Sequence, residues 1–389
     1  MNELCIDVGY KSINKHGEQL CGDMVQIIKT PESTVLVLAD GLGSGVKANI
    51  LSTLTSKIIS TMIAEKMDIE DCVNTVISTL PVCKVRGVAY STFTIIKITD
   101  NEYADIIQYD NPQVILLRDG KNYEYAVNQR TIAGKTILES RVQLLENDVF
   151  IAMSDGAIYA GVGDLMNYGW QRDNIVEYAE NRYDSEKTAQ AIATDIDDAC
   201  NDLYMNMPGD DTTVAALKVR KRRVVNLLFG PPSNPKDVSK MMTMFFAKQG
   251  EHIVSGGTTS TLTSEFLGKK METSIDYIDP KIPPIAKIEG VDLVTEGVLT
   301  INGVLEYVRD YAGENKLYQE WHTKRDGASL ITVKLIDVAT DINFYVGRAV
   351  NPAHQNPNLP IGFNIKMQLV EDLSKTLREL GKNINVSYF

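Results

Sequence analysis

Four short acidic segments carry the residues of this chain that are best suited to chemistry. Asp40 ends the apolar run STVLVLAD and is followed by GLGSG, and Asp155 ends NDVFIAMSD and is again followed by glycine. Asp23 and the pair Asp210 and Asp211 stand beside further β-branched runs. Each segment taken alone is typical of a turn. Together, carboxylates at the edges of several predicted strands indicate one shared acidic site.

Clustered carboxylates next to glycine favour a site for hard divalent cations. Mg²⁺ and Mn²⁺ prefer oxygen ligands and keep several waters. Two such ions share a bridging carboxylate, and a water bound between them ionises near neutral pH and attacks phosphorus in line. A glycine beside the bridging acid lets a backbone carbonyl approach an ion, because no Cβ intervenes. We therefore expect Asp40 to bridge two ions and Gly41 to offer its carbonyl oxygen.

The composition argues against several classes of function. The formal net charge of −12 is unfavourable for a protein that binds nucleic acid or anionic membranes. No apolar run approaches the roughly 20 residues that span a bilayer, and the N-terminus lacks the layout of a signal peptide. Five cysteines without a CxxC pair and four histidines do not favour a zinc site. These features predict a cytoplasmic protein with reduced thiols, no membrane or nucleic-acid partner, and any metal held by oxygen.

The elements that must position the acids form two different patterns. Residues 1–220 contain many short strands, one pair of helices after the Asp40 loop and another pair before the last strand. This pattern predicts an α+β sandwich flanked by helices. The expected strands cover 5–13, 24–30, 33–40, 89–99, 103–110, 113–120, 123–127, 147–156 and 212–219, and the expected helices cover about 45–66, 69–80, 173–183 and 185–205.

After the basic segment KVRKRR, strands alternate with helices. This alternation predicts a second, α/β domain over 221–389 with a largely parallel sheet. The expected strands cover 223–230, 251–257, 271–278, 336–350 and 383–389, and the expected helices cover 235–250, 261–270, 301–313 and 364–380.

The loop SGGTTS in the second domain follows an expected strand and opens an expected helix. In open α/β sheets, ligands bind where strand ends meet helix N-termini. The loop lacks the lysine of a GxxxxGK[ST] sequence, but its N–H groups and hydroxyls suit a small anion. The alternative is that Thr259 or Ser260 only caps the helix. The candidate ligand-binding residues are Gly256, Gly257, Thr258, Thr259 and Ser260.

The acidic segments, in their order, resemble the metal-dependent protein serine/threonine phosphatases of the PPM (type 2C) class, in their SpoIIE-like bacterial branch. The resemblance covers residues 1–219. The segments that carry it are GD (22–23), ADGLGSG (39–45), AYSTF (89–93), DNPQVILLRDG (110–120), MSDGAIYAG (153–161) and GDDTTVAALKV (209–219). It implies a fold of two antiparallel sheets packed face to face with helices outside, and it does not extend to the second domain.

The resemblance also implies roles and partners. It assigns the bridging position to Asp40, the carbonyl ligand to Gly41, and an outer position at the metal site to Asp211. It assigns the other metal carboxylates to Asp23, Asp155 and Asp210. We expect catalysis to depend most on Asp40 and Asp155. The implied cofactors are two Mn²⁺ or Mg²⁺ ions. The implied substrate is phosphoserine or phosphothreonine on a small bacterial regulatory protein, such as an anti-sigma-factor antagonist.

Some positions depart from the family pattern. Leu42 stands where eukaryotic members have a histidine, and the phosphate-clamping arginine of those members has only Lys11 and Lys15 as substitutes. In the branch, the helix at about 45–66 acts as a switch that completes the metal site. The alternative for that helix is an amphipathic helix that covers the core. The alternative for the whole chain is a signalling scaffold or ligand sensor of low activity, with the anion bound by the second domain.

Overall fold

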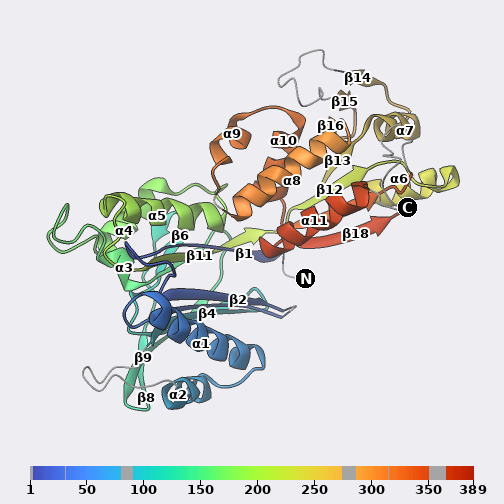
Figure 1. Cartoon of the computed structure of the whole chain (residues 1–389). Helices are drawn as coiled ribbons and strands as arrows, with labels where there is room; N and C mark the ends of the chain where they lie inside the picture. The colour runs from blue at the N-terminus through green and yellow to red at the C-terminus, as the bar shows by residue number, and fades with distance from the viewer. Residues whose placement is uncertain (1–2, 31, 80–90, 274–285, 314, 350–364) are drawn as a thin grey trace. The chain divides into compact units, whose positions relative to one another are not determined.

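The computed structural model describes residues 3–30, 32–79, 91–273, 286–313, 315–349 and 365–389 (Figure 1). Within the family-like segments, Ala89 and Tyr90 therefore lie outside the described residues. The chain divides into two compact units, Met1–Lys221 and Arg222–Phe389. The acidic segments all belong to the first unit, and the SGGTTS loop belongs to the second.

The N-terminal unit contains β1 (Leu4–Ile13), β2 (Asp23–Lys29), β3 (Ser33–Gly41), α1 (Gly45–Ala64), α2 (Ile69–Thr79), β4 (Ser91–Thr99), β5 (Tyr103–Tyr109), β6 (Ile115–Arg118), β7 (Lys121–Asn122), β8 (Asn128–Ile132), β9 (Lys135–Gln143), β10 (Val149–Met153), α3 (Asp155–Ile158), α4 (Arg172–Arg182), α5 (Ala189–Leu203) and β11 (Thr212–Lys221). The strands pair antiparallel in two sheets. Over the described residues the sheet orders are β1-β11-β10-β6-β7 and β2-β3-β4-β5-β9-β8.

The two sheets pack face to face, with helices on both outer sides. The period-2 geometry of a strand sends alternate residues of β3 to opposite faces. Leu36 and Leu38 enter the core between the sheets, whereas Val35 and Val37 pack against α1 and α2. On the other outer side, β10 and β11 pack against α4 and α5. Because β3 is buried on both faces, its sequence is a continuous apolar run. The predicted α+β sandwich flanked by helices is confirmed.

The strand predictions failed locally between β6 and β10. The segment 123–127, expected as a strand, forms no strand, and its Tyr125 hydroxyl donates to the Val114 carbonyl at 2.7 Å. The hairpin of β8 and β9 was missed. Its turn residues Ala133 and Gly134 have φ of 47° and 75°, so it is a tight turn without the usual Asn-Gly signal. Both strands are largely polar in sequence and β8 is mostly exposed, so the hydrophobic pattern was weak.

The C-terminal unit contains β12 (Val224–Phe229), the 3₁₀ turn η1 (Pro235–Asp237), α6 (Val238–Phe246), β13 (Glu251–Ser255), α7 (Gly257–Leu267), β14 (Met271–Thr273), β15 (Ala286–Ile288), β16 (Leu293–Thr295), α8 (Val298–Ala312), α9 (Tyr318–Thr323), α10 (Gly327–Val333), the π turn η2 (Lys334–Val338), β17 (Asp341–Val346), α11 (Ile365–Glu379) and β18 (Asn383–Tyr388). Among the described residues these strands form one sheet in the order β14-β15-β16-β13-β12-β17-β18. Its five strands from β16 to β18 are parallel, and β14 and β15 add an antiparallel edge. The predicted, largely parallel sheet is confirmed.

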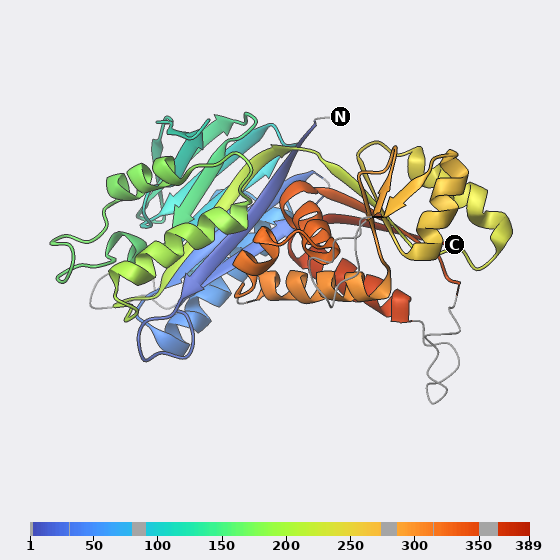
Figure 2. The same cartoon turned by 90° about the horizontal axis from the view of Figure 1, so that it is seen from above.

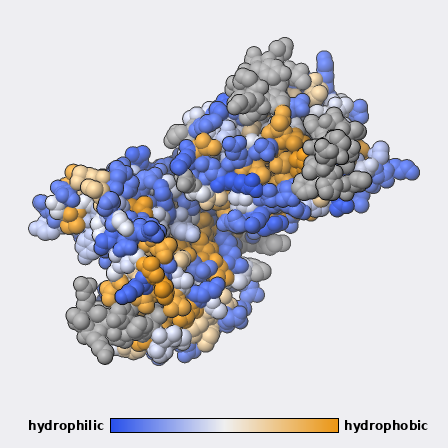
Figure 3. Space-filling model, viewed as in Figure 1, coloured by the Kyte–Doolittle hydropathy of each residue, from blue (hydrophilic) through white to orange (hydrophobic). Residues whose placement is uncertain are grey.

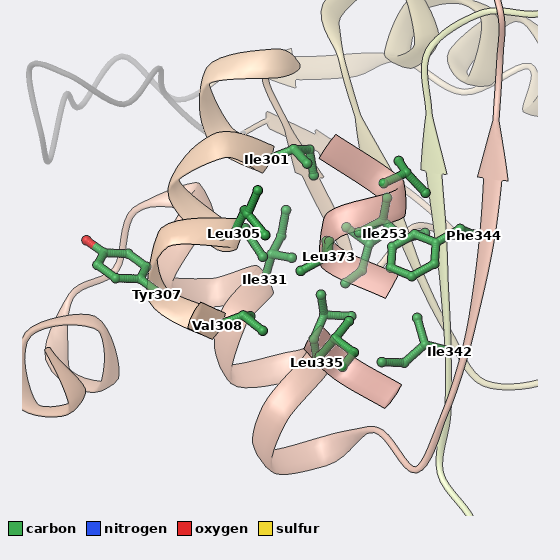
Figure 4. Close-up of a cluster of buried hydrophobic side chains, with 14 of the residues drawn as sticks. Ile253, Ile301, Leu305, Tyr307, Val308, Ile331, Leu335, Ile342, Phe344 and Leu373 are labelled. Carbon is green, nitrogen blue, oxygen red and sulfur yellow. The ribbon is translucent and has the colours of Figure 1, made fainter. Parts of the chain in front are cut away.

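Helices cover both faces of this sheet. Leu227 of β12 belongs to a core formed with α8, α10 and α11, and Leu228 belongs to a second core formed with α6. Figure 4 shows Leu305 and Val308 of α8 and Leu373 of α11 on the face of the sheet toward which Phe344 of β17 points. Figures 1 and 2 both show α8 (orange) and α11 (red) side by side. The unit is therefore a three-layer α/β structure.

Two strands expected in this unit, over 336–350 and 271–278, agree with the structure only in part. The strand expected over 336–350 is shorter, because residues 334–338 form a π turn that continues α10, and β17 begins only at Asp341. The apolar residues Leu335 and Ile336 are buried in the helical layer, so a run that looked like strand belongs to the helix. Of the strand expected over 271–278, residues 271–273 form β14, and residues 274–278 lie outside the described part.

Candidate metal centre

The acids of the N-terminal unit lie at the ends of strands in both sheets. Asp23, at the start of β2, is the direct antiparallel partner of Asp40, near the end of β3. Asp155 follows β10 and begins the short helix α3, while Asp210 and Asp211 lead into β11. Since β10 and β11 are antiparallel neighbours, the end of one and the start of the other meet at the same edge of their sheet. The register therefore gathers two acids at the edge of one sheet and three at the edge of the other.

Contacts between the sheets bring these two groups together. The carboxyl groups of Asp40 and Asp155 are within hydrogen-bonding reach of each other. A Cβ atom on Gly22 would lie 2.6 Å from Asp211 Oδ2, so the Asp211 carboxylate lies against the residue that precedes Asp23. Backbone N–H of Lys15 donates to Asp211 Oδ1 at 3.0 Å. Tertiary structure thus joins five carboxylates from four strand ends into one site.

Glycine is required at two positions by close approach. A Cβ atom on Gly41 would lie 2.1 Å from the carbonyl oxygen of Ala48 in α1. A Cβ atom on Gly156 would lie 2.2 Å from the carbonyl oxygen of Asp211. No real side chain fits at such distances, so each glycine lets a second segment approach an acid. The glycine-rich loop therefore admits α1 to the end of β3.

The pKa values show an accumulation of negative charge. Burial raises the pKa of Asp23 to about 7, and the charges of Asp211 and Asp155 add to this, against hydrogen bonds from Ser154 and Thr213. The Asp40 pKa rises to about 9 because of burial and then the charges of neighbouring carboxylates.

The pKa values of Asp155 and Asp210 are also raised, in both cases mainly by burial. Clustered carboxylates with raised pKa values form a site that binding of a cation would stabilise.

The donor set fits divalent cations. The buried atoms Asp23 Oδ2 and Asp211 Oδ2 have no hydrogen-bond partner among the described residues, although buried carboxylate oxygens are normally paired. In the described part of the chain, no three His, Cys, Asp or Glu side chains are arranged to hold one ion by themselves. Water and the Gly41 carbonyl would therefore complete the coordination, as Mg²⁺ sites commonly allow. The residues that could hold metal are Asp23, Asp40, Gly41, Asp155 and Asp210, with Asp211 beside them.

Helix α1 differs from the amphipathic helix considered from the sequence. Its buried side chains include Ser52, Thr55, Ser56 and Ser60, and each of these hydroxyls donates to a carbonyl within the helix. Small side chains permit the close approach of α1 to β3. Its exposed apolar side chains Val46, Ile50 and Leu54 follow a spacing of four residues, and apolar surface is visible around α1 in Figure 3. The expectation of polar residues outside and apolar residues inside is therefore wrong for its first three turns.

Two buried residues around the acids were not predicted from the sequence. Ser154 is buried, and its hydroxyl accepts the Thr213 N–H at 2.9 Å, which ties β10 to β11 beside Asp155. Asp197 of α5 is buried with both carboxylate oxygens unpartnered among the described residues, and burial raises its pKa to about 7. A serine before Asp-Gly is a local signal for the first, whereas no sequence signal marks Asp197 within the helical pattern.

The two lysines considered as phosphate clamps differ in position. Lys11 Nζ forms an ion pair with Asp198 at 2.5 Å. Lys15 lies near the acids, since its charge lowers the pKa of Asp210 against the larger effect of burial. Leu42 is half-buried directly after Gly41. Of the two lysines, only Lys15 lies where it could approach a substrate phosphate.

A helix-flanked β-sandwich with acids at the ends of its strands is the arrangement that the resemblance to the PPM class implied. The model of the family "Stage II sporulation protein E (SpoIIE)" matches residues 30–220. The N-terminal unit therefore carries a protein serine/threonine phosphatase domain of the SpoIIE family, as the resemblance implied. A search of the curated proteins finds no match.

Several solved structures are similar in fold to part of this chain. The phosphatase domain of SpoIIE from Bacillus subtilis shares 19% identity, with a TM-score of 0.44 over 57% of this chain and 95% of that one. The RsbU and RsbW domains of a Mycobacterium tuberculosis protein share 14% identity, with a TM-score of 0.46 over 62% of this chain and 70% of theirs. RsbX in complex with magnesium shares 21% identity, with a TM-score of 0.40 over 56% of this chain and 97% of that one.

In the described part of the chain, no helix has the length and apolar character needed to cross a membrane.

Proposed function

We propose that the phosphatase domain hydrolyses phosphoserine or phosphothreonine on a regulatory protein, with a water activated by two divalent cations, Mn²⁺ or Mg²⁺. The observation that carries this proposal is the convergence of carboxylates from four strand ends, with raised pKa values and unpartnered buried oxygens. When bound, two such ions supply Lewis-acid activation of water at neutral pH.

The residues of the chain have distinct roles in this proposal. Asp40 would be the ligand shared by both ions, because it pairs with Asp23 on the neighbouring strand β2 and its carboxyl group lies within hydrogen-bonding reach of Asp155. Gly41 offers its carbonyl oxygen from the same strand end. Asp155 and Asp210 would bind the ions from the other sheet, where β10 ends and β11 begins. Asp211 holds the acids in place, because its carboxylate lies against Gly22 and accepts a backbone N–H.

The substrate class rests on the family. SpoIIE-like phosphatases act on phosphorylated regulatory proteins, and the family model of this branch matches residues 30–220. A small anti-sigma-factor antagonist is the substrate type that we propose. Helix α1 is the proposed switch, because its backbone contacts Gly41 directly.

The test uses the full chain with an aryl phosphate and with phosphoserine, phosphothreonine and phosphotyrosine peptides, in Mn²⁺, in Mg²⁺ and after chelation. We expect turnover of the aryl phosphate and of the first two peptides only with a divalent cation, and its loss in Asp40→Asn. Asp197→Asn is the matched control, since Asp197 is also a buried acid with a raised pKa in the same unit but was not assigned to the metal site. Equal activity of Asp40→Asn and the wild type would refute the assignment.

A further inference from the structure

The loops after β13 and β16 in the C-terminal unit meet at a switch point of the parallel sheet. The two strands are parallel neighbours, paired from Ile253 with Leu293 to Ser255 with Thr295. Helix α7, which follows β13, packs through Leu262 on the face that α6 covers. Helix α8, which follows β16, packs through Ile301 on the opposite face. Adjacent strands whose helices diverge in this way leave a crevice at their carboxyl ends, where open α/β sheets bind ligands.

The two loops approach each other closely through glycine. Each helix has glycine as its N-cap, Gly256 for α7 and Gly297 for α8, without a side-chain cap. A Cβ atom on Gly297 would lie 3.4 Å from the Gly256 Cα. Gly256 has φ of 119°, which favours glycine, and its N–H donates to the Thr295 carbonyl at 2.9 Å. The N-termini of α7, a helix of 11 residues, and α8, a helix of 15 residues, therefore lie beside one another.

Buried hydroxyls at these N-termini lack partners. Thr259 is only 1% exposed, and its Oγ1 has no hydrogen-bond partner in the described structure. A Cβ atom on Gly256 would lie 3.1 Å from this hydroxyl, so the hydroxyl faces the N-terminal end of α7. Thr300, fully buried in the equivalent third position of α8, also has an unpartnered Oγ1 by the same criterion. A buried hydroxyl without a partner costs free energy, which a bound acceptor would recover.

The expectation that Thr259 or Ser260 caps α7 is wrong, because neither does. The Ser260 hydroxyl instead donates to the Gly256 carbonyl at 2.9 Å. The N–H groups of Gly257, Thr258 and Thr259 lie in the first turn, where no earlier helical carbonyl is available to them. Uncapped N–H groups, two helix dipoles and hydroxyl donors all favour the same kind of ligand, a small oxyanion.

From this geometry we propose that the adjoining N-termini of α7 and α8 bind a phosphate group, either free or as a phosphate monoester. Thr259 Oγ1 and the first-turn N–H groups of α7 donate to it, and α8 contributes its N-terminus and Thr300. The exposed carboxylate of Glu296 stands at the edge of this site, since a Cβ atom on Gly257 would lie 3.7 Å from its Oε1. Glu296 therefore competes with the ligand for the dipole of α7 and weakens its binding.

The experiment is calorimetric titration of the full chain with inorganic phosphate and, separately, with 5′-AMP. A chelator is present so that neither probe binds through metal at the phosphatase site. We expect saturable binding of at least one probe, and the stronger of the two identifies a free or an esterified ligand. Thr259→Val, which keeps the shape and removes the hydroxyl, should weaken binding at least about tenfold, the typical effect of a hydrogen bond to a charged group. Thr300→Val should also weaken it, and Glu296→Gln should strengthen it.

The control is Thr263→Val, one turn further along α7. The Thr263 hydroxyl is buried but already donates to the Thr259 carbonyl at 2.8 Å. Its loss should lower the melting temperature and leave phosphate affinity unchanged. Thr259→Val should instead keep or raise the melting temperature of the ligand-free protein. Absence of binding by both probes, or equal affinity of Thr259→Val and wild type, would overturn the proposal. Tighter binding by Thr263→Val than by wild type would overturn the placement at α7.

Discussion

Replacing Asp23 by asparagine should stabilise the metal-free protein and destabilise the metal-loaded one. In the folded state without metal, burial and neighbouring charges raise the Asp23 pKa from 3.8 to about 7. The folded state then binds more protons than the unfolded state between these values, so the free energy of unfolding falls as the pH rises. The stability that Asp23 contributes is complete below about pH 4 and is lost as the pH rises through about 7.

The size of the effect follows from the same shift. A pKa difference of roughly three units corresponds to about 4 kcal/mol at pH values above both pKa values. Asparagine resembles the protonated acid in shape and carries no charge, so Asp23→Asn should avoid most of this cost. At about pH 8 in a chelator, we expect the variant to unfold roughly 5–15 °C above the wild type, given the usual scaling for about 200 residues. At about pH 4 the two proteins should unfold at nearly the same temperature.

The assay monitors one unit at a time. The two tryptophans are divided between the units, Trp170 in the first and Trp321 in the second. In a Trp321→Phe background, the fluorescence of the buried Trp170 reports unfolding of the phosphatase domain alone. Manganese should stabilise the wild type by mass action, and Asp23→Asn should lose that response.

Asp197→Asn is the matched control for this prediction. The pKa of Asp197 is also raised to about 7, mainly by burial, so this variant should gain stability in the chelator as well. Because Asp197 is not a proposed ligand, its response to manganese should match that of the wild type. If Asp23→Asn were less stable than the wild type at about pH 8 without metal, our account of the charge cluster would be wrong.

Three further outcomes follow from the site. Asp40→Asn and Asp155→Asn should each lower turnover of an aryl phosphate by at least about a hundredfold in saturating Mn²⁺, because the metal-activated water is lost. Circular dichroism should show an unchanged fold. Near-normal turnover of either variant would refute the two-ion assignment. Gly156→Ala should lower apparent metal affinity, measured by titration of activity with Mn²⁺, since the added Cβ would lie 2.2 Å from the Asp211 carbonyl; unchanged affinity would show that this approach does not position the acids. Ser56→Leu, on the buried face of α1, should lower the free energy of unfolding by about 1–3 kcal/mol through overpacking and should reduce turnover. A loss of stability with full turnover would show that the position of α1 does not affect the metal site.

Much of the fold followed from the sequence where the hydrophobic pattern was strong. The apolar run of β3 and the helical spacing of α5 were recognised because burial on both faces, or on one helical stripe, determines the residue types directly. The hairpin of β8 and β9 was missed because its side chains are largely polar and its turn lacks the usual Asn-Gly signal. The π turn at residues 334–338 was misread because its buried apolar residues satisfy either pattern.

The candidate site, too, was predictable in part and depended in part on the tertiary structure. The sequence determined which acids stand at strand ends and which of them precede glycine, since these are local features of chain and turn. Only the tertiary structure decided that Asp40 and Asp155, from different sheets, come within hydrogen-bonding reach, and that α1 packs through hydroxyl side chains against β3. In the second unit, the sequence identified one glycine-rich loop, but only the order of the strands placed Gly297 beside it. Contacts between segments distant in sequence depend on strand register and on which face each helix covers, and no local pattern encodes either.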